Sequence, residues 1–288
     1  MRAVSTQGPG GLTGARTPQM RHESGEVLVF DDPLALSRCH MLAVPMSAYV
    51  PDVAALFAAP AAGLRLIEAL DAAAWGEVRR VVGPGGDEGW RRSVLSAEGL
   101  EMDETELRGC VAAGFNMPPS QYQLHIQYIF PPLLPQHLAL LRDGVHFTPG
   151  RFLPFAYIRE ALARLGDTPL RGSIKPSTAD TSADALIEAI EVATGLEYIP
   201  AHTAFLTAFL EANAKLANYD AAAFRYAKHA RTGTVIGLHE SLDRGEAPAA
   251  KDVDKQDTRV LQTYGRSPHG LKYYSFYRDP PSALPELR

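Results

Sequence analysis

The clearest alternation of apolar and polar side chains along the chain lies in residues 122–130. Apolar or aromatic residues take one set of alternate positions, and mainly polar residues take the other: Tyr122, Leu124, Ile126 and Tyr128 against Gln123, His125, Gln127 and Ile129. A period of two is typical of a strand whose successive side chains point to opposite faces. The pattern therefore predicts a β-strand with one polar face, on which Gln, His and Gln follow one another.

Two shorter apolar runs occur earlier in the chain. Residues 27–30 (Val-Leu-Val-Phe) and residues 40–45 (His-Met-Leu-Ala-Val-Pro) flank a segment that begins Asp31-Asp32-Pro33. Apolar runs around a turn-forming segment predict two short strands joined by a loop. After them a short helix is predicted over 52–59. A longer helix is predicted from Pro60, with Leu64, Ile67, Trp75, Val78 and Val82 at helical spacing and an end at residues 83–86.

Beyond Pro135 the spacing of apolar residues becomes mostly helical. Helices are predicted over residues 155–165, 183–194 and 203–228, where Phe205, Phe209 and Leu216 mark a buried face. Charged residues crowd 240–259, which indicates a surface excursion, and residues 271–277 form either a strand or an aromatic cluster packed on the core. The predicted fold class is α+β, with the strands in residues 23–135 and a mostly helical extension over 136–288.

The first 22 residues differ from the rest of the chain. They contain arginine, glycine, serine, threonine and proline, with no acidic residue before Glu23 and no apolar stretch typical of a secretory signal. Such a composition predicts a disordered tail over residues 1–22. An organelle transit peptide is the alternative interpretation of the same composition.

Composition and charge exclude several classes of protein. With 46% hydrophobic residues, 28 basic against 33 acidic side chains and a net charge of -5, the chain has no overall field that attracts long nucleic acids. Its 2 cysteines cannot build a disulfide framework or a four-cysteine zinc site. No run approaches the ~18 apolar residues of a membrane-spanning helix. We therefore expect a soluble, cytoplasmic protein with no membrane partner.

The polar face around His125 is the strongest candidate for chemistry. A single histidine on a strand is more often structural than catalytic, but here amide side chains rather than apolar ones stand beside it. Two amides can hold an imidazole in orientation without charging it, which suits a nucleophile that attacks phosphorus. A zinc site would need further His, Cys or carboxylate ligands where Gln123 and Gln127 stand. We therefore expect no metal and no cofactor at this site.

Two blocks of the sequence resemble the histidine-triad (HIT) family of nucleotide hydrolases and transferases. The first block runs from Leu28-Val-Phe-Asp-Asp-Pro33 to His40-Met-Leu-Ala-Val-Pro45, and the second is Ser120-Gln-Tyr-Gln-Leu-His-Ile-Gln127, which is similar to the family's His-x-His-x-His/Gln motif. The resemblance covers roughly residues 24–135. It implies a HIT-like antiparallel sheet with a packed helix and a nucleotide-binding domain over 23–135.

The resemblance also implies roles for individual residues. His125 matches the nucleophile that takes a nucleotidyl group on its ring, and Gln127 matches the last motif position, which is Gln in the transferase and phosphorylase branches of the family. Nucleotide contacts would come from Asp32 to the ribose hydroxyls, and from Ser120 and Asn116 to phosphate. Gln123 is counted with the nucleotide-binding residues, but it departs from the motif, because the first position is normally His, and this replacement puts the catalytic rate in doubt.

The sequence therefore carries two hypotheses about function. The first is an enzyme that transfers or hydrolyses a nucleotidyl group of a nucleoside polyphosphate or related nucleotide through His125. The second is a nucleotide-binding or interaction module that kept the pocket and lost turnover at Gln123. A histidine in an apolar strand, such as His40, is more often part of the core than of a functional site. A homodimer is expected only if the helical extension leaves the sheet edge uncovered.

Overall fold

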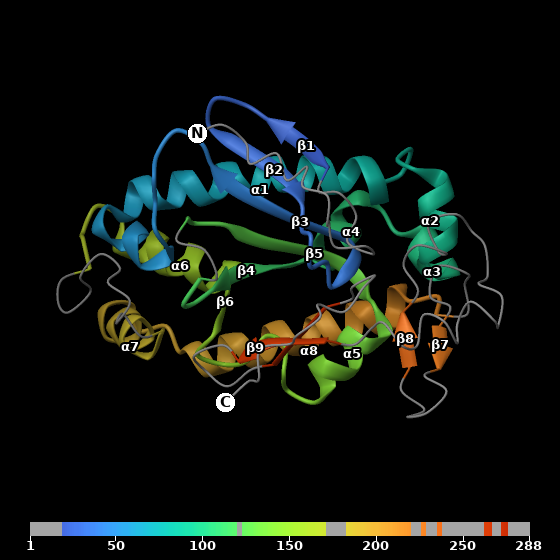
Figure 1. The fold of residues 1–288 in the computed structure, drawn as a ribbon. Helices are drawn as coiled ribbons and strands as arrows, with labels where there is room; N and C mark the ends of the chain where they lie inside the picture. The colour runs from blue at the N-terminus through green and yellow to red at the C-terminus, as the bar shows by residue number, and fades with distance from the viewer. Residues whose placement is uncertain are drawn as a thin grey trace, which may run out of the picture.

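The computed structural model describes residues 19–119, 123–170 and 183–219, together with four short strands near the C-terminus (Figure 1). Its centre is a six-stranded antiparallel sheet in the order β1-β2-β3-β5-β4-β6. The strands are β1 (Met20–Glu23), β2 (Val27–Asp31), β3 (Ser37–Pro45), β4 (Ala112–Asn116), β5 (Ile126–Leu133) and β6 (Phe152–Pro154). Two separate pairs follow, β7 (Tyr226–Lys228) with β8 (Val235–Gly237) and β9 (Gln262–Arg266) with β10 (Lys272–Ser275).

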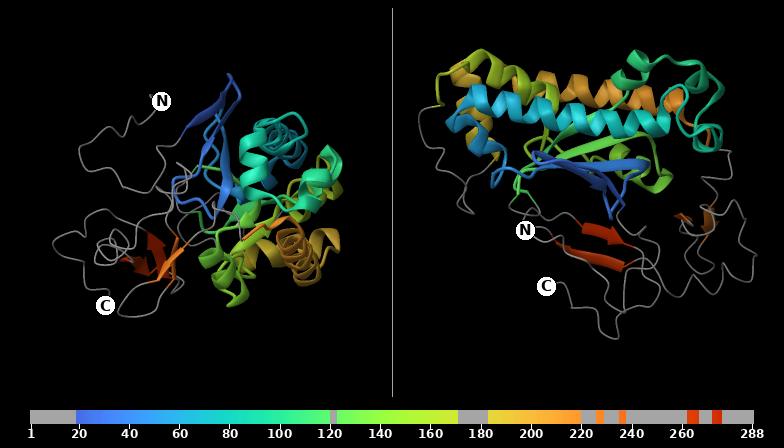
Figure 2. Two further views of the ribbon diagram at one scale, coloured as in Figure 1. Left: turned by 90° about the vertical axis from the view of Figure 1, so that its right-hand side faces the viewer. Right: turned by 90° about the horizontal axis from the view of Figure 1, so that it is seen from above.

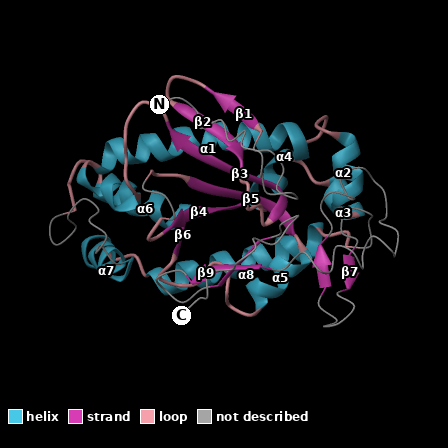
Figure 3. Ribbon diagram, viewed as in Figure 1, coloured by secondary structure: helices cyan, strands magenta, loops and turns pink. Residues whose placement is uncertain are grey.

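Helices occupy much of the remaining described chain, as Figure 3 shows in cyan. They are the 3-10 helix η1 (Val53–Ala58) and the α-helices α1 (Pro60–Val82), α2 (Glu88–Val94), α3 (Ala97–Glu101), α4 (Glu104–Gly109), α5 (Pro135–Arg142), α6 (Phe155–Leu165), α7 (Ala183–Thr194) and α8 (Tyr198–Leu216). The mixed α and β composition of the fold class is thus confirmed, as is an antiparallel sheet with packed helices.

The two faces of the sheet are packed differently. Val29, Ala43 and Ile126 share one face, which we call the helix face, because they pack into the core formed with α1. Phe30, Leu42 and Gln127 pair across three strands on the opposite face, which we call the site face. In the view from above in Figure 2, α1 runs along one side of the blue strands β2 and β3.

On the site face, helices cover the sheet at one end. Ala112, Ile129 and Phe152 lie on this face and pack into a second core with Leu138 of α5 and Phe209 of α8. Farther along the same face, Phe30, Leu42 and Gln127 are only half-buried. The site face is thus closed by helices beside β6 and less covered toward β2.

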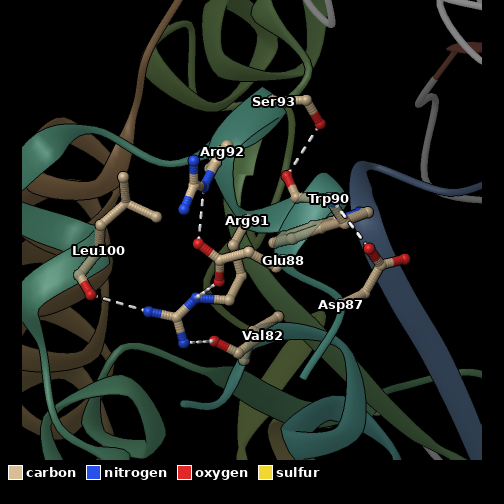
Figure 4. A network of polar contacts seen from close by, with 8 residues as sticks. All are labelled: Val82, Asp87, Glu88, Trp90, Arg91, Arg92, Ser93 and Leu100. Carbon is tan, nitrogen blue, oxygen red and sulfur yellow. Dashed lines mark hydrogen bonds and ion pairs between the residues drawn. The ribbon is translucent and has the colours of Figure 1, made fainter. Parts of the chain in front are cut away.

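A buried arginine ties the end of α1 to the next two helices (Figure 4). Arg91 of α2 is 4% exposed and donates to the carbonyl of Val82 at 2.9 Å and to that of Leu100 at 2.8 Å. The last carbonyls of a helix have no partner inside the helix, so a side-chain donor there satisfies groups that burial would otherwise leave unpaired. Arg91 therefore fixes how the chain turns after α1.

Several element boundaries differ from the sequence-based expectation. β1 takes in residues 20–22, which composition placed in the tail, because Arg21 forms a bidentate pair with the buried Asp31 of β2 at 2.7 and 2.8 Å. The helix predicted over 203–228 was wrong at both ends: α8 begins at Tyr198 and stops at Leu216, after which Ala217 forms a β-bridge with Leu95.

The segment assigned to the helical extension also contributes to the main sheet. β6 lies in that segment and pairs with β4, placing Pro154 opposite Gly114. Gly114 is required there, since a Cβ atom at this position would lie 2.5 Å from the ring of Phe152. The first half of the chain and its extension therefore share one sheet.

Candidate functional site

The ring of His125 is oriented by the backbone two residues before it. Leu124 is buried in the core and its N–H donates to the carbonyl of Val50 at 2.6 Å, which fixes the chain just before β5. Nδ1 of His125 lies 2.8 Å from the carbonyl oxygen of Gln123. A carbonyl only accepts, so Nδ1 carries a hydrogen, and in the neutral ring the lone pair lies on Nε2. Within the described residues, Nε2 forms no hydrogen bond.

Gln127 is held by His40 on the neighbouring strand. His40 is 4% exposed, and its Nδ1 accepts the N–H of Leu36 at 3.1 Å. This bond places the ring hydrogen on Nε2, which donates to Oε1 of Gln127 at 2.6 Å. With Oε1 occupied by His40, the amide group of Gln127 turns its two N–H donors away from His40. They are the donors that this side chain can offer to a ligand.

Burial keeps His40 neutral although an acid lies beside it. Desolvation is the largest influence and lowers the pKa of His40, while Asp32 and the hydrogen bond to Gln127 raise it by less. Oδ2 of Asp32 lies 3.3 Å from Nε2 of His40. A neutral His40 donates one hydrogen bond in a fixed direction, so it acts as a rigid support for Gln127.

The two consecutive aspartates serve opposite faces of the sheet. Asp31 points to the helix face and pairs with Arg21. Asp32 accepts the N–H of Leu34 through Oδ1 at 2.7 Å, which is the turn role typical of an aspartate before proline, and approaches His40 through Oδ2. Asp32 therefore combines the turn role and a place at the site.

The remaining expected site residues are distributed as follows. Asn116 ends β4, is half-buried and shares the site face with Gln127, since Gly114 two residues earlier pairs with Gln127. Gln123 uses its side-chain amide to donate to the carbonyl of Pro45 at 3.2 Å. Ser120 lies outside the described residues.

His40 is the residue to which sequence reasoning gave too little weight. Its contact with Gln127 joins positions 87 residues apart. A histidine in an apolar run gives no local sign of such a contact, and only the pairing of β3 with β5, which sets Leu42 opposite Gln127, brings the two together. One signal in the sequence could have pointed to His40: it begins the block of residues 40–45 that resembles the HIT family.

A third imidazole lies within electrostatic reach of His40. Burial lowers the pKa of His146 to about 4, and His40 contributes a further lowering.

In the segments described, no three His, Cys, Asp or Glu side chains gather in a way that would hold a metal ion. None of the described helices is long and apolar enough to cross a membrane.

Comparisons of the chain with protein-family models, with curated proteins and with solved structures gave no match. The chemistry proposed for the site therefore rests on the atoms of its own side chains. Those atoms are a histidine with an oriented ring, an amide with a fixed direction, and a carboxylate held beside a buried histidine.

Proposed function

We propose that the chain transfers a nucleotidyl group through a covalent intermediate on His125, and that it is a HIT-type enzyme. The observation that carries the proposal is the 2.8 Å contact between Nδ1 of His125 and the carbonyl of Gln123. A nucleophilic imidazole needs one nitrogen with a free lone pair and the other held by an acceptor, which stabilises the positive charge formed on attack. A buried structural histidine would gain from the same bond only a partner for one ring nitrogen.

The reaction follows from these atoms in two displacements. Nε2 of His125 attacks the α-phosphorus of a nucleoside polyphosphate, the new P–N bond forms, and the bond from phosphorus to the leaving phosphate oxygen breaks. An acceptor oxygen then attacks the same phosphorus, the P–N bond breaks, and His125 is regenerated. Each displacement gains mainly from positioning and from donors aimed at the phosphoryl oxygens.

Gln127 and Asn116 are suited to supply such donors. The amide hydrogens of Gln127 are directed away from His40, because Oε1 is already bound to that ring. An amide has no proton to exchange near neutral pH, so it stabilises the phosphoryl group but cannot act as a base toward water. An acceptor that is already anionic, such as phosphate, is therefore the preferred second substrate, and hydrolysis is the slower outcome.

The same geometry favours an enzyme over a module that has lost turnover. That alternative rests on Gln123 standing where the HIT motif has histidine. The group that orients His125 is the backbone carbonyl of residue 123, which any side chain at this position would provide. The side chain of Gln123 instead bonds to Pro45 and connects the two blocks of the resemblance.

The proposal is tested by trapping the intermediate. Full-length protein is incubated with an α-32P-labelled nucleoside triphosphate or dinucleoside polyphosphate and examined for protein-bound label that is stable in base and lost in acid. We expect label on the wild type and none on His125→Ala, with turnover reduced by roughly a thousandfold or more.

His22→Ala is the matched control, because His22 lies on β1 on the helix face, away from the site. It should take up label like the wild type. Equal labelling of His125→Ala, or nucleotide binding by the wild type without label or turnover, would reject the proposed mechanism and leave a binding module.

A further inference from the structure

Two histidines outside the candidate site bring their ring nitrogens together. Nδ1 of His137, on α5, lies 3.0 Å from Nε2 of His146, in the loop between α5 and β6. The ring centroids are 5.1 Å apart and the rings are tilted by 47°. Both side chains are half-buried. The two nitrogens therefore face each other at the rim of the second core.

The loop that carries His146 is fixed by the residue that follows it. Phe147 has a φ of 51°, in the left-handed region that is unusual for a residue with a side chain. Its ring is anchored edge-on by Phe152 at 4.7 Å, Phe209 at 5.6 Å and Phe205 at 5.8 Å. Strained residues persist only where surrounding packing determines them. The aromatic cluster thus holds the backbone that aims His146 at α5.

We propose that His137 and His146 together bind one divalent transition-metal ion, with Zn²⁺ as the expected ion. Imidazole nitrogens bind zinc at about 2.0–2.1 Å, so two of them in adjacent positions lie about 3.0 Å apart at a right angle and about 3.4 Å apart in a tetrahedron. The observed separation falls at the short end of that range. Borderline ions such as Zn²⁺ prefer imidazole, whereas Mg²⁺ and Ca²⁺ prefer oxygen ligands.

Binding requires a change of tautomer at the pair and a turn of the two rings, so that both lone pairs point to the ion rather than along the line between the nitrogens. Without metal, one ring donates its N–H to the other nitrogen. With metal, both facing nitrogens present lone pairs, and each ring keeps its hydrogen on the nitrogen that points away. Within the described residues, no third His, Cys, Asp or Glu joins the pair, which therefore offers two protein ligands. This site is independent of the proposed function of His125.

The experiment measures zinc binding by the full chain. Protein purified without a histidine tag and treated with EDTA is titrated with ZnCl₂ by calorimetry, and with CoCl₂ by visible absorption. We expect one site per chain in the wild type. His137→Gln and His146→Asn should each weaken zinc binding by about tenfold or more, because each removes one of two protein ligands while keeping a polar group.

The chain has 9 histidines, so the control has to separate this pair from the others. His125→Ala should bind zinc as the wild type does. Loss of binding in His125→Ala together with retention in His146→Asn would place the ion at the candidate nucleotide site and overturn the proposal. Absence of zinc binding by the wild type, with all variants folded by circular dichroism, would show that the pair is an ordinary hydrogen bond.

Discussion

Asp32 has two separable duties that a pair of substitutions can distinguish. Its Oδ1 holds the turn at Leu34, and its other oxygen lies beside His40. Asp32→Ala should weaken nucleotide binding by roughly 1.5–3 kcal/mol, the range of a charge-assisted hydrogen bond to a ligand hydroxyl, and should also loosen the turn. Asp32→Asn keeps an acceptor for the turn and removes the charge.

The measurement is nucleotide affinity by calorimetry beside thermal unfolding. If Asp32 binds ribose, Asp32→Asn loses affinity but keeps its unfolding temperature. Full affinity in both variants would show that Asp32 holds the turn and does not bind the nucleotide.

Gln127 sets the fate of the nucleotidyl group in the proposed mechanism. Replacing it with histidine puts a titratable ring where the amide now bonds to His40. Such a ring can accept a proton from water, so Gln127→His should raise the ratio of nucleoside monophosphate to acceptor product. Product analysis at several phosphate concentrations measures this ratio.

Gln123→His is the matched control for that experiment. It restores histidine at the first motif position, while residue 127 remains an amide. Its product ratio should therefore equal that of the wild type. A ratio that moves equally in both variants, or in neither, would contradict the role assigned to Gln127.

At the scale of elements, Arg91 connects the end of α1 to α2 and α3, and a pair of substitutions can measure this connection. Arg91→Met fills the space but leaves the carbonyls of Val82 and Leu100 without their donors, so we expect a loss of about 2–4 kcal/mol in the free energy of unfolding. Arg92→Met is the control: the Arg92 side chain is 73% exposed and pairs with the exposed Glu88, so the loss should be under about 1 kcal/mol. Urea unfolding compares the two, and equal losses would contradict the bridging role.

Elements that show their period within one segment could be predicted from the sequence. The helices over 155–165 and 183–194 match α6 and α7, and Pro60 begins α1 as its position predicts. Elements defined by partners elsewhere in the chain could not. β6 is only three residues long and exists because β4 pairs with it, and α8 ends where Ala217 meets Leu95. His40 belongs to the same class, since its role comes from the register of β3 on β5.

At the scale of the molecule, the two edges of the sheet differ. β6 covers the edge of β4, so the extension occupies the side through which a sheet-to-sheet dimer would form there. The opposite edge is β1, which is four residues long and carries charged side chains, features that discourage pairing with another chain. A homodimer and a cytoplasmic location stay predictions from the sequence.

Two buried histidines and one half-buried histidine should make the stability of the whole molecule fall in mild acid. Burial lowers the pKa of His40, His202 and His146, the last to about 4, whereas a histidine in the unfolded chain titrates near 6.5. Below about pH 6.5 the unfolded chain therefore binds protons that the folded chain does not bind. Stability rises with pH wherever the unfolded state binds more protons. The contribution of these histidines to the free energy of unfolding is therefore fully present above about pH 6.5 and is lost as the pH falls toward 4.

Urea unfolding in EDTA at pH 7.5, 6 and 5 tests this window, which lies above the range where most carboxylates become protonated. The free energy of unfolding should drop steadily over the three values. His146→Asn removes one of the three rings and should make the drop smaller than in the wild type. Stability that rises between pH 7.5 and 5, or an equal drop in His146→Asn and the wild type, would mean that proton uptake by these rings does not limit the folded state.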